Sequence, residues 1–155
     1  MAENHIDVLK DLIEVCRDGQ NGYLHAAGHV IDPELKSYFN QQSLERGRFA
    51  VELQDEIEKL GAPAPETTGS VAAALHRTWF ELKADLGGGD QSVINSVEQG
   101  EDRAKQVYEQ ALRSSLPSPV LNLIARQYTS VRAAHDRVRD IRDAGSEEQR
   151  KRPAA

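Results

Sequence analysis

The sequence predicts an all-α four-helix bundle made of two antiparallel hairpins, which are joined by a long crossover containing a short fifth helix. Three observations support this prediction. Apolar residues recur every three or four positions along four long segments, which is the period of an amphipathic helix. Proline and glycine separate these segments. Only 5% of the residues are aromatic, so the core must be mostly aliphatic, a composition that favours helices.

The first hairpin comprises predicted helices over residues 4–30 and 33–60. The stripe on the first helix has intervals of three and four and consists of Ile6, Leu9, Ile13, Cys16, Gln20, Tyr23, Ala27 and Val30. Between the helices, Asp32 is a favourable N-cap and Pro33 a favourable first helical residue. Gly61 ends the second helix.

The second hairpin comprises predicted helices over residues 91–115 and 118–143. Asp90 is a favourable N-cap for the first of these helices. A tight turn at Pro117 makes the two helices antiparallel neighbours. The remaining residues, 144–155, are polar and are predicted to form a disordered tail.

The connection between the hairpins is long, with roughly 29 residues. It includes a predicted helix over residues 70–86, which covers about 24 Å at a rise of 1.5 Å per residue. A simple up-and-down bundle needs only a short loop at this point. One long crossover between two hairpins is the ferritin-like topology. We therefore assign residues 1–143 to one ferritin-like domain with a single core.

Charge and hydropathy narrow the possible classes of function. The net charge of −6 argues against a general binder of nucleic acids or acidic membranes. No apolar run approaches the roughly 18 residues that span a bilayer, and the N-terminus lacks the pattern of a secretory signal. We therefore expect a cytoplasmic protein. Cys16, the only cysteine, lies on an apolar stripe and is interpreted as a small core residue.

Five polar residues interrupt the apolar stripes of the long helices. They are Gln20 on the first helix, Gln42 and Arg46 on the second, Glu101 on the third and Gln127 on the fourth. Counted from the helix ends, these positions fall at similar heights, which predicts one broad polar layer at mid-bundle. Ferritin-like proteins build di-metal sites there, with a Glu from each of two helices and Glu-x-x-His from each of the other two.

That ligand pattern is incomplete in this chain. Arg48 stands where the second helix would need a His, and Arg132 stands three residues before His135, where the fourth helix would need a Glu. A guanidinium repels a metal cation, so we expect Arg46 to pair with Glu101. We interpret the polar layer as a buried hydrogen-bonded network that sets the register of the helices.

A non-canonical metal site is the alternative interpretation of the same layer. It would bind iron or manganese through carboxylates and imidazoles. The candidate ligands are Glu52, His76, Glu98, Glu101 and His135. In the interpretation without a metal, His135 pairs with Glu98 on the neighbouring helix. The Arg and Asp residues of the last helix are typical of a solvent-exposed face with ion pairs.

Several segments together carry a family resemblance. They are DLIEVCRDGQNGYLHAA, RGRFAVELQDEIEKLG, GSVAAALHRTWFELKADL, VEQGEDRAKQVYEQAL and RQYTSVRAAHDRV. The combination of LHRTW, GEDRAKQVYEQAL and AAHDRV resembles the bacterial ferritin-like family catalogued as domain of unknown function 2383. The resemblance covers about residues 4–143 and implies a ferritin-like bundle of bacterial origin. It implies no activity and supplies no catalytic residues.

Three functions are compatible with this sequence. The favoured one is a non-enzymatic structural or interaction protein that self-associates, with no catalytic residues and no cofactor. The second is a metal-binding or metal-oxidising protein with iron or manganese at a site around Glu98 and Glu101. The third is a carrier of a small ligand in an apolar pocket near Trp79. Fold alone does not choose among them.

Overall fold

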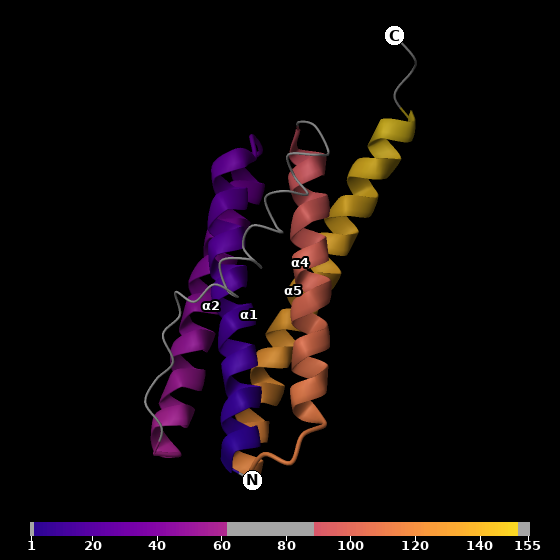
Figure 1. Ribbon diagram of the computed structural model, residues 1–155. Helices are drawn as coiled ribbons and strands as arrows, with labels where there is room; N and C mark the ends of the chain where they lie inside the picture. Colours follow the sequence, from indigo (N-terminus) through magenta and orange to yellow (C-terminus); the bar gives the residue numbers. More distant parts are fainter. Residues whose placement is uncertain (1, 62–88, 152–155) are drawn as a thin grey trace.

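The computed structural model describes residues 2–61 and 89–151, and the side chains of residues 5–61 and 89–145. Within these ranges the chain forms helices and no strands. The helices are α1 (Ala2–His29), α2 (Pro33–Lys59), α4 (Asp90–Leu112) and α5 (Ser118–Lys151). They lie side by side as a bundle (Figure 1). The all-α four-helix bundle predicted from the sequence is therefore confirmed.

Part of the predicted architecture lies outside the described residues. The short fifth helix, predicted over residues 70–86, belongs to this part, together with His76 and Trp79. The ligand role predicted for His76 and the pocket predicted near Trp79 therefore have no counterpart in the description that follows.

The positions of the described helix ends show how the two hairpins are placed relative to each other. The carboxylate of Asp90, at the start of α4, accepts hydrogen bonds from the backbone N–H groups of Ile31 (2.8 Å) and Asp32 (3.0 Å) in the α1–α2 turn. The end of α2 lies at the opposite end of the bundle (Figure 1). The end of α2 and the start of α4 therefore lie at opposite ends of the bundle, as the predicted crossover requires.

Packing determines which helices face each other. α1 packs against α2 and α4, and α5 packs against α4 with a smaller contact to α2. α2 and α4 therefore lie diagonally across the bundle, and so do α1 and α5. A side chain that joins α2 to α4 must consequently pass through the interior.

The two predicted helix caps have different outcomes. Asp32 is the N-cap of α2, and its carboxylate accepts a hydrogen bond from the N–H of Glu34 (2.9 Å), as predicted. The prediction that Asp90 caps α4 is wrong, because Gly89 is the N-cap and Asp90 lies in the first turn. Gly89 has φ 91°, a conformation that favours glycine, and the Asp90 carboxylate is used by the α1–α2 turn instead.

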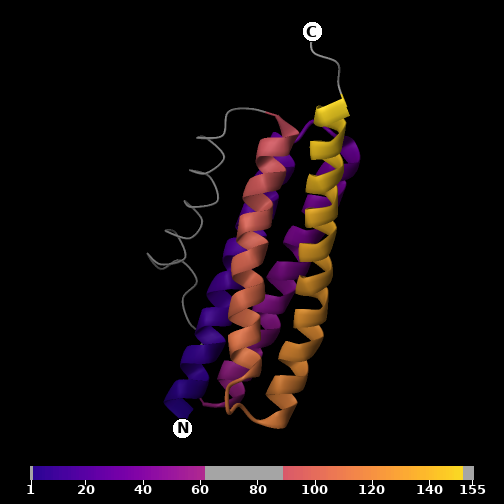
Figure 2. The same ribbon diagram turned by 90° about the vertical axis from the view of Figure 1, so that its right-hand side faces the viewer.

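Helix α5 is longer than the sequence predicts. Its predicted end is residue 143, whereas the helix continues to Lys151. The residues after Gly145 are mostly strong helix formers, so this one glycine, which costs about 1 kcal/mol relative to alanine, does not end the helix. The last part of α5 extends beyond the other three helices (Figure 2).

Two apolar clusters fill the interior, at different heights along the bundle. The cluster towards the start of α1 includes Leu9, Leu12, Ile13, Leu53, Ile57 and Ile124. The cluster towards the α1–α2 turn includes Tyr23, Phe39, Val93, Ile94 and Val138. Between the two clusters, buried polar side chains occupy the middle of the bundle, and these form the candidate site.

Candidate functional site

An ion pair between Arg46 of α2 and Glu101 of α4 crosses the interior between the two apolar clusters. Nη2 of Arg46 donates to Oε2 of Glu101 at 2.7 Å, and the two side chains are 1% and 0% exposed. Burial alone would lower the pKa of Arg46, but the adjacent carboxylate more than compensates and holds it above its ordinary value. The guanidinium is therefore a permanent positive charge at mid-bundle.

Residues of α1 create the space for this guanidinium. A Cβ atom at Gly19 would lie 3.2 Å from Nη1 of Arg46, so the glycine lets α1 approach the cation closely. The Cζ atom of Arg46 lies 5.5 Å from the centroid of the Tyr23 ring, a cation–π geometry. Burial raises the pKa of Tyr23 well above its ordinary value, and the negative charge of Glu101 raises it further. The phenol beside the ion pair therefore stays neutral.

Two glutamines predicted for the layer lie at its edge instead. Gln20 and Gln42 are half-buried, and neither is bonded to the ion pair. Gln20 accepts a hydrogen bond from Arg17 Nη1 (2.8 Å), and its amide packs against Gly47. On α1 the inward position belongs to Gly19, which has no side chain that a periodicity analysis could recognise.

A second set of polar contacts joins all four helices next to the ion pair. The hydroxyl of Tyr108 donates to Oε1 of Gln127 at 2.7 Å and lies 3.1 Å from the Cys16 thiol. Nε2 of Gln127 donates to Oε1 of Glu52 at 3.1 Å and to the carbonyl of Phe49 at 3.3 Å. Because the Tyr108 proton is given to Gln127, the Cys16 thiol acts as a donor to the tyrosine oxygen. The polar roles of Tyr108 and Cys16 are not apparent from the sequence, since both residues lie on apolar stripes and resemble ordinary core residues.

The environment of Cys16 makes its thiol unreactive. Burial raises the pKa of Cys16 to about 11. A raised pKa keeps the group protonated at neutral pH, and only the thiolate is a nucleophile. The interpretation of Cys16 as a buried core residue agrees with its 0% exposure.

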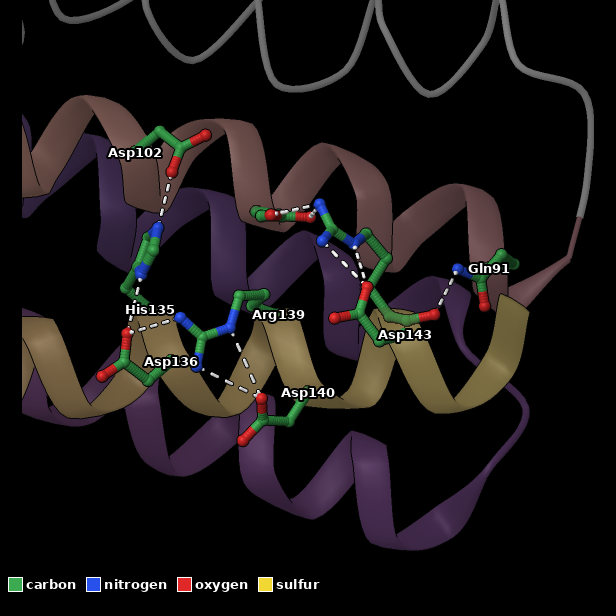
Figure 3. Close-up of polar contacts among 9 residues, drawn as sticks. Gln91, Asp102, His135, Asp136, Arg139, Asp140 and Asp143 are labelled. Carbon is green, nitrogen blue, oxygen red and sulfur yellow. Dashed lines mark hydrogen bonds and ion pairs between the residues drawn. The ribbon is translucent and has the colours of Figure 1, made fainter. Parts of the chain in front are cut away.

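His135 joins α4 to α5 near the surface (Figure 3). Its Nε2 atom lies 2.6 Å from Asp102, and its Nδ1 atom lies 3.1 Å from Asp136. Both nitrogens can donate at once only when the ring is an imidazolium. The hydrogen bond from His135 lowers the pKa of Asp136.

The predicted contact between His135 and Glu98 is wrong. Glu98 accepts instead from Nη1 of Arg142, 2.7 Å from Oε2, further along α5. Asp102 lies one helical turn after Glu98 on α4 and faces His135. The sequence places both carboxylates on the correct helix but does not distinguish between successive turns.

The candidate metal ligands that the structure describes, Glu52, Glu98, Glu101 and His135, do not converge on one point. Among the described residues, Glu101 pairs with Arg46, Glu98 with Arg142, Glu52 with Gln127, and His135 with two aspartates. In that part of the chain, no group of three His, Cys, Asp or Glu side chains is arranged to hold a metal ion. The donor set that a di-metal centre requires is thus divided among separate polar contacts.

Comparison with known families identifies the chain. A family model described as Domain of unknown function (DUF2383) matches residues 4–114. The chain belongs to this family. The DUF2383 match is shorter than the range of 4–143 expected from the resemblance, and it ends before α5. A search of curated proteins gives no match to the chain.

The DUF2383 region contains both partners of the central ion pair. Arg46 and Glu101 lie inside the matched range, whereas Gln127 and His135 lie beyond it.

Within the residues that the structure describes, none of the helices of this DUF2383 chain has both the length and the apolar character needed to cross a bilayer. The charged face of α5 carries exposed ion pairs such as that between Arg139 and Asp140 (3.3 Å; Figure 3). Pairs of this kind contribute little to stability.

Proposed function

We propose that this protein is a non-enzymatic structural or interaction protein, built on a ferritin-like bundle in a bacterial cytoplasm. The observation that carries the proposal is the buried ion pair between Arg46 and Glu101. It supplies a fixed cation at mid-bundle, where a ferritin-like enzyme would need carboxylates and imidazoles around its metals. The hydrogen bonds from Tyr108 through Gln127 to Glu52 satisfy further polar groups of the same layer.

A structural role for the layer agrees with what buried polar contacts do in general. Replacing a buried ion pair by apolar residues is often neutral or stabilising, so such pairs add little to stability. A buried polar network favours the register of the helices that pairs most of its groups, although Nε of Arg46 has no hydrogen-bond partner among the described residues. Here the network contacts every helix of the described bundle, which supports a role in aligning them.

The metal content of the purified protein tests this function. We expect protein expressed without added metal to carry well below one iron or manganese atom per chain, because the Arg46 guanidinium repels a cation and already occupies the Glu101 carboxylate. Elemental analysis by mass spectrometry measures this directly. About two metal atoms per chain, lost in Glu101→Ala and kept in Glu58→Ala, would contradict the proposal. That result would favour the alternative, a metal-binding or metal-oxidising protein with its site around Glu98 and Glu101. Glu58 is an exposed glutamate of α2 and serves as the control.

Self-association is the form of interaction that we propose. Two apolar side chains on α2, Leu44 (75% exposed) and Val51 (48% exposed), are seven residues apart and so share one face of the helix. Leu24 on the adjacent helix α1 is also exposed. Contact between two copies through the face of α2 that carries Leu44 and Val51 would bury these two side chains, as homodimer interfaces commonly do.

Sedimentation velocity tests the self-association. We expect the wild-type chain to sediment as a dimer or larger species, and Leu44→Glu to shift it towards the monomer, because the substitution places a charge in an apolar contact. Gln106→Glu adds the same charge at an exposed position of α4, which lies diagonally opposite α2, and should leave the assembly unchanged. A monomeric wild-type protein, or equal effects of the two variants, would rule out this surface.

A further inference from the structure

A cleft lies at the end of the bundle where α1 turns into α2 and α4 begins. It has a volume of about 380 Å³, within the range of small-molecule sites. Its apolar walls come from three helices and include Leu35 and Tyr38 of α2, Ile94 of α4 and Ile141 of α5. The cleft is separate from the ion pair at mid-bundle, so neither the structural role nor the metal-binding role considered for that layer uses it.

Hydrogen bonds between the helices hold the walls of this cleft in fixed positions. The Asp90 carboxylate binds two backbone N–H groups of the α1–α2 turn, which holds the turn against α4. Nε2 of Gln91 donates to the carbonyl of Arg142 at 3.3 Å, which holds α4 against α5 (Figure 3). Gly145 permits this approach, since a Cβ atom there would overlap the Gln91 side chain. The cleft is therefore preformed, and a ligand would not have to open it.

The charges around the cleft are unbalanced. Three carboxylates line it, those of Asp32, Glu34 and Asp90, with one guanidinium, that of Arg137, so the lining carries a net charge of −2. The Arg137 guanidinium lies against the Tyr38 ring, with its Cζ atom 5.0 Å from the ring centroid, a contact that fixes its position and leaves its charge unchanged. Burial raises the pKa of Tyr38 to about 12, so its hydroxyl adds no further charge. The Glu34 side chain is exposed at the rim and can meet an incoming cation.

From these features we propose that the cleft binds a small organic cation with an apolar body, such as an alkylamine. The apolar body would lie against Leu35, Ile94 and Ile141, and the ammonium group would lie at the rim near Glu34 and Asp32. The carboxylates attract the ammonium group, and the apolar walls bury the hydrocarbon body. A simple metal cation would leave the walls unused, and an organic anion would be repelled by the rim.

Three probes of equal length and different charge test this proposal on the full chain. They are hexylammonium, hexanol and hexanoate, titrated at low salt and followed by the amide NMR signals of Leu35, Ile94 and Ile141. We expect saturable binding of hexylammonium in the high micromolar to millimolar range, at least tenfold tighter than hexanoate and tighter than hexanol. Added salt should narrow the difference between the charged probes. Equal affinity for hexanol, tighter binding of hexanoate, or no saturable shift with any probe would overturn the proposal.

Variants at the rim and in the wall of the cleft distinguish the contribution of charge to ligand binding from that of the apolar cavity. Glu34→Gln should weaken hexylammonium binding about three- to tenfold and leave hexanol binding unchanged, because it removes charge and no apolar wall. Glu58→Gln removes the same charge from an exposed site of α2 outside the cleft and should change neither. Ala144→Phe, at an exposed position of the wall, should fill the cleft and abolish binding of all three probes. If Glu34→Gln and Glu58→Gln act equally, or if Ala144→Phe still binds hexylammonium normally while circular dichroism shows an intact fold, the ligand does not occupy this cleft.

Discussion

Replacing Arg46 by methionine is expected to lower the free energy of unfolding by about 3–5 kcal/mol. The substitution leaves the Glu101 carboxylate, which is 0% exposed, without its cation in the interior. Methionine keeps much of the apolar length of the arginine stem, so the loss reports mainly the uncompensated charge. Urea-induced unfolding followed by far-UV circular dichroism measures the effect.

The paired replacement distinguishes an aligning role from a stabilising one. Arg46→Met combined with Glu101→Leu removes both charges, and we expect it to recover most of the stability lost by Arg46→Met alone. Arg139→Met is the control, because the Arg139 side chain is 44% exposed and forms its ion pairs at the surface. This substitution should lower the free energy of unfolding by less than about 1 kcal/mol. A double variant as unstable as the single one would show that the interior cannot accept apolar residues at this layer. A single variant within about 1 kcal/mol of wild type would show that Glu101 is not isolated from water.

Replacing Phe39 by alanine is expected to destabilise the bundle by about 3–5 kcal/mol. Phe39 is fully buried, and its ring centroid lies 5.6 Å from that of Tyr23 and 6.1 Å from that of Tyr38. The truncation would remove both aromatic contacts and leave a cavity in the apolar cluster towards the α1–α2 turn. The same unfolding measurement reports the loss.

An exposed leucine of the same helix is the matched control for Phe39. Leu44 is 75% exposed, so Leu44→Ala should change the unfolding free energy by no more than about 0.5 kcal/mol, measured at a concentration where the chain is monomeric. Equal losses in the two variants would mean that Phe39 does not lie in a closely packed interior. A loss in Leu44→Ala that appears only at high protein concentration would instead support self-association through α2.

The polar layer illustrates what can be predicted from residue chemistry. A charged side chain on an apolar stripe must find a partner, so Arg46 and Glu101 could be matched by counting turns along straight helices. The same counting misplaced Gln20, because Gly19 is the residue that faces the interior and has no side chain to reveal it. Cys16 and Tyr108 were read as apolar for a related reason, since each can fill a core and also donate a hydrogen bond.

The sequence by itself determined the helical segments, the N-cap at Asp32 and the height of the central ion pair, because these depend on local periodicity and on the cost of burying charge. The tertiary structure alone decided which turn of one helix meets which turn of the next. Asp102, the partner of His135, lies one helical turn, about 5.4 Å, from Glu98 on the same helix. The periodicity of the sequence is the same for both positions and cannot distinguish between them. The cleft beneath the α1–α2 turn has the same origin, since its walls come from segments distant in sequence whose spacing depends on how the helices pack.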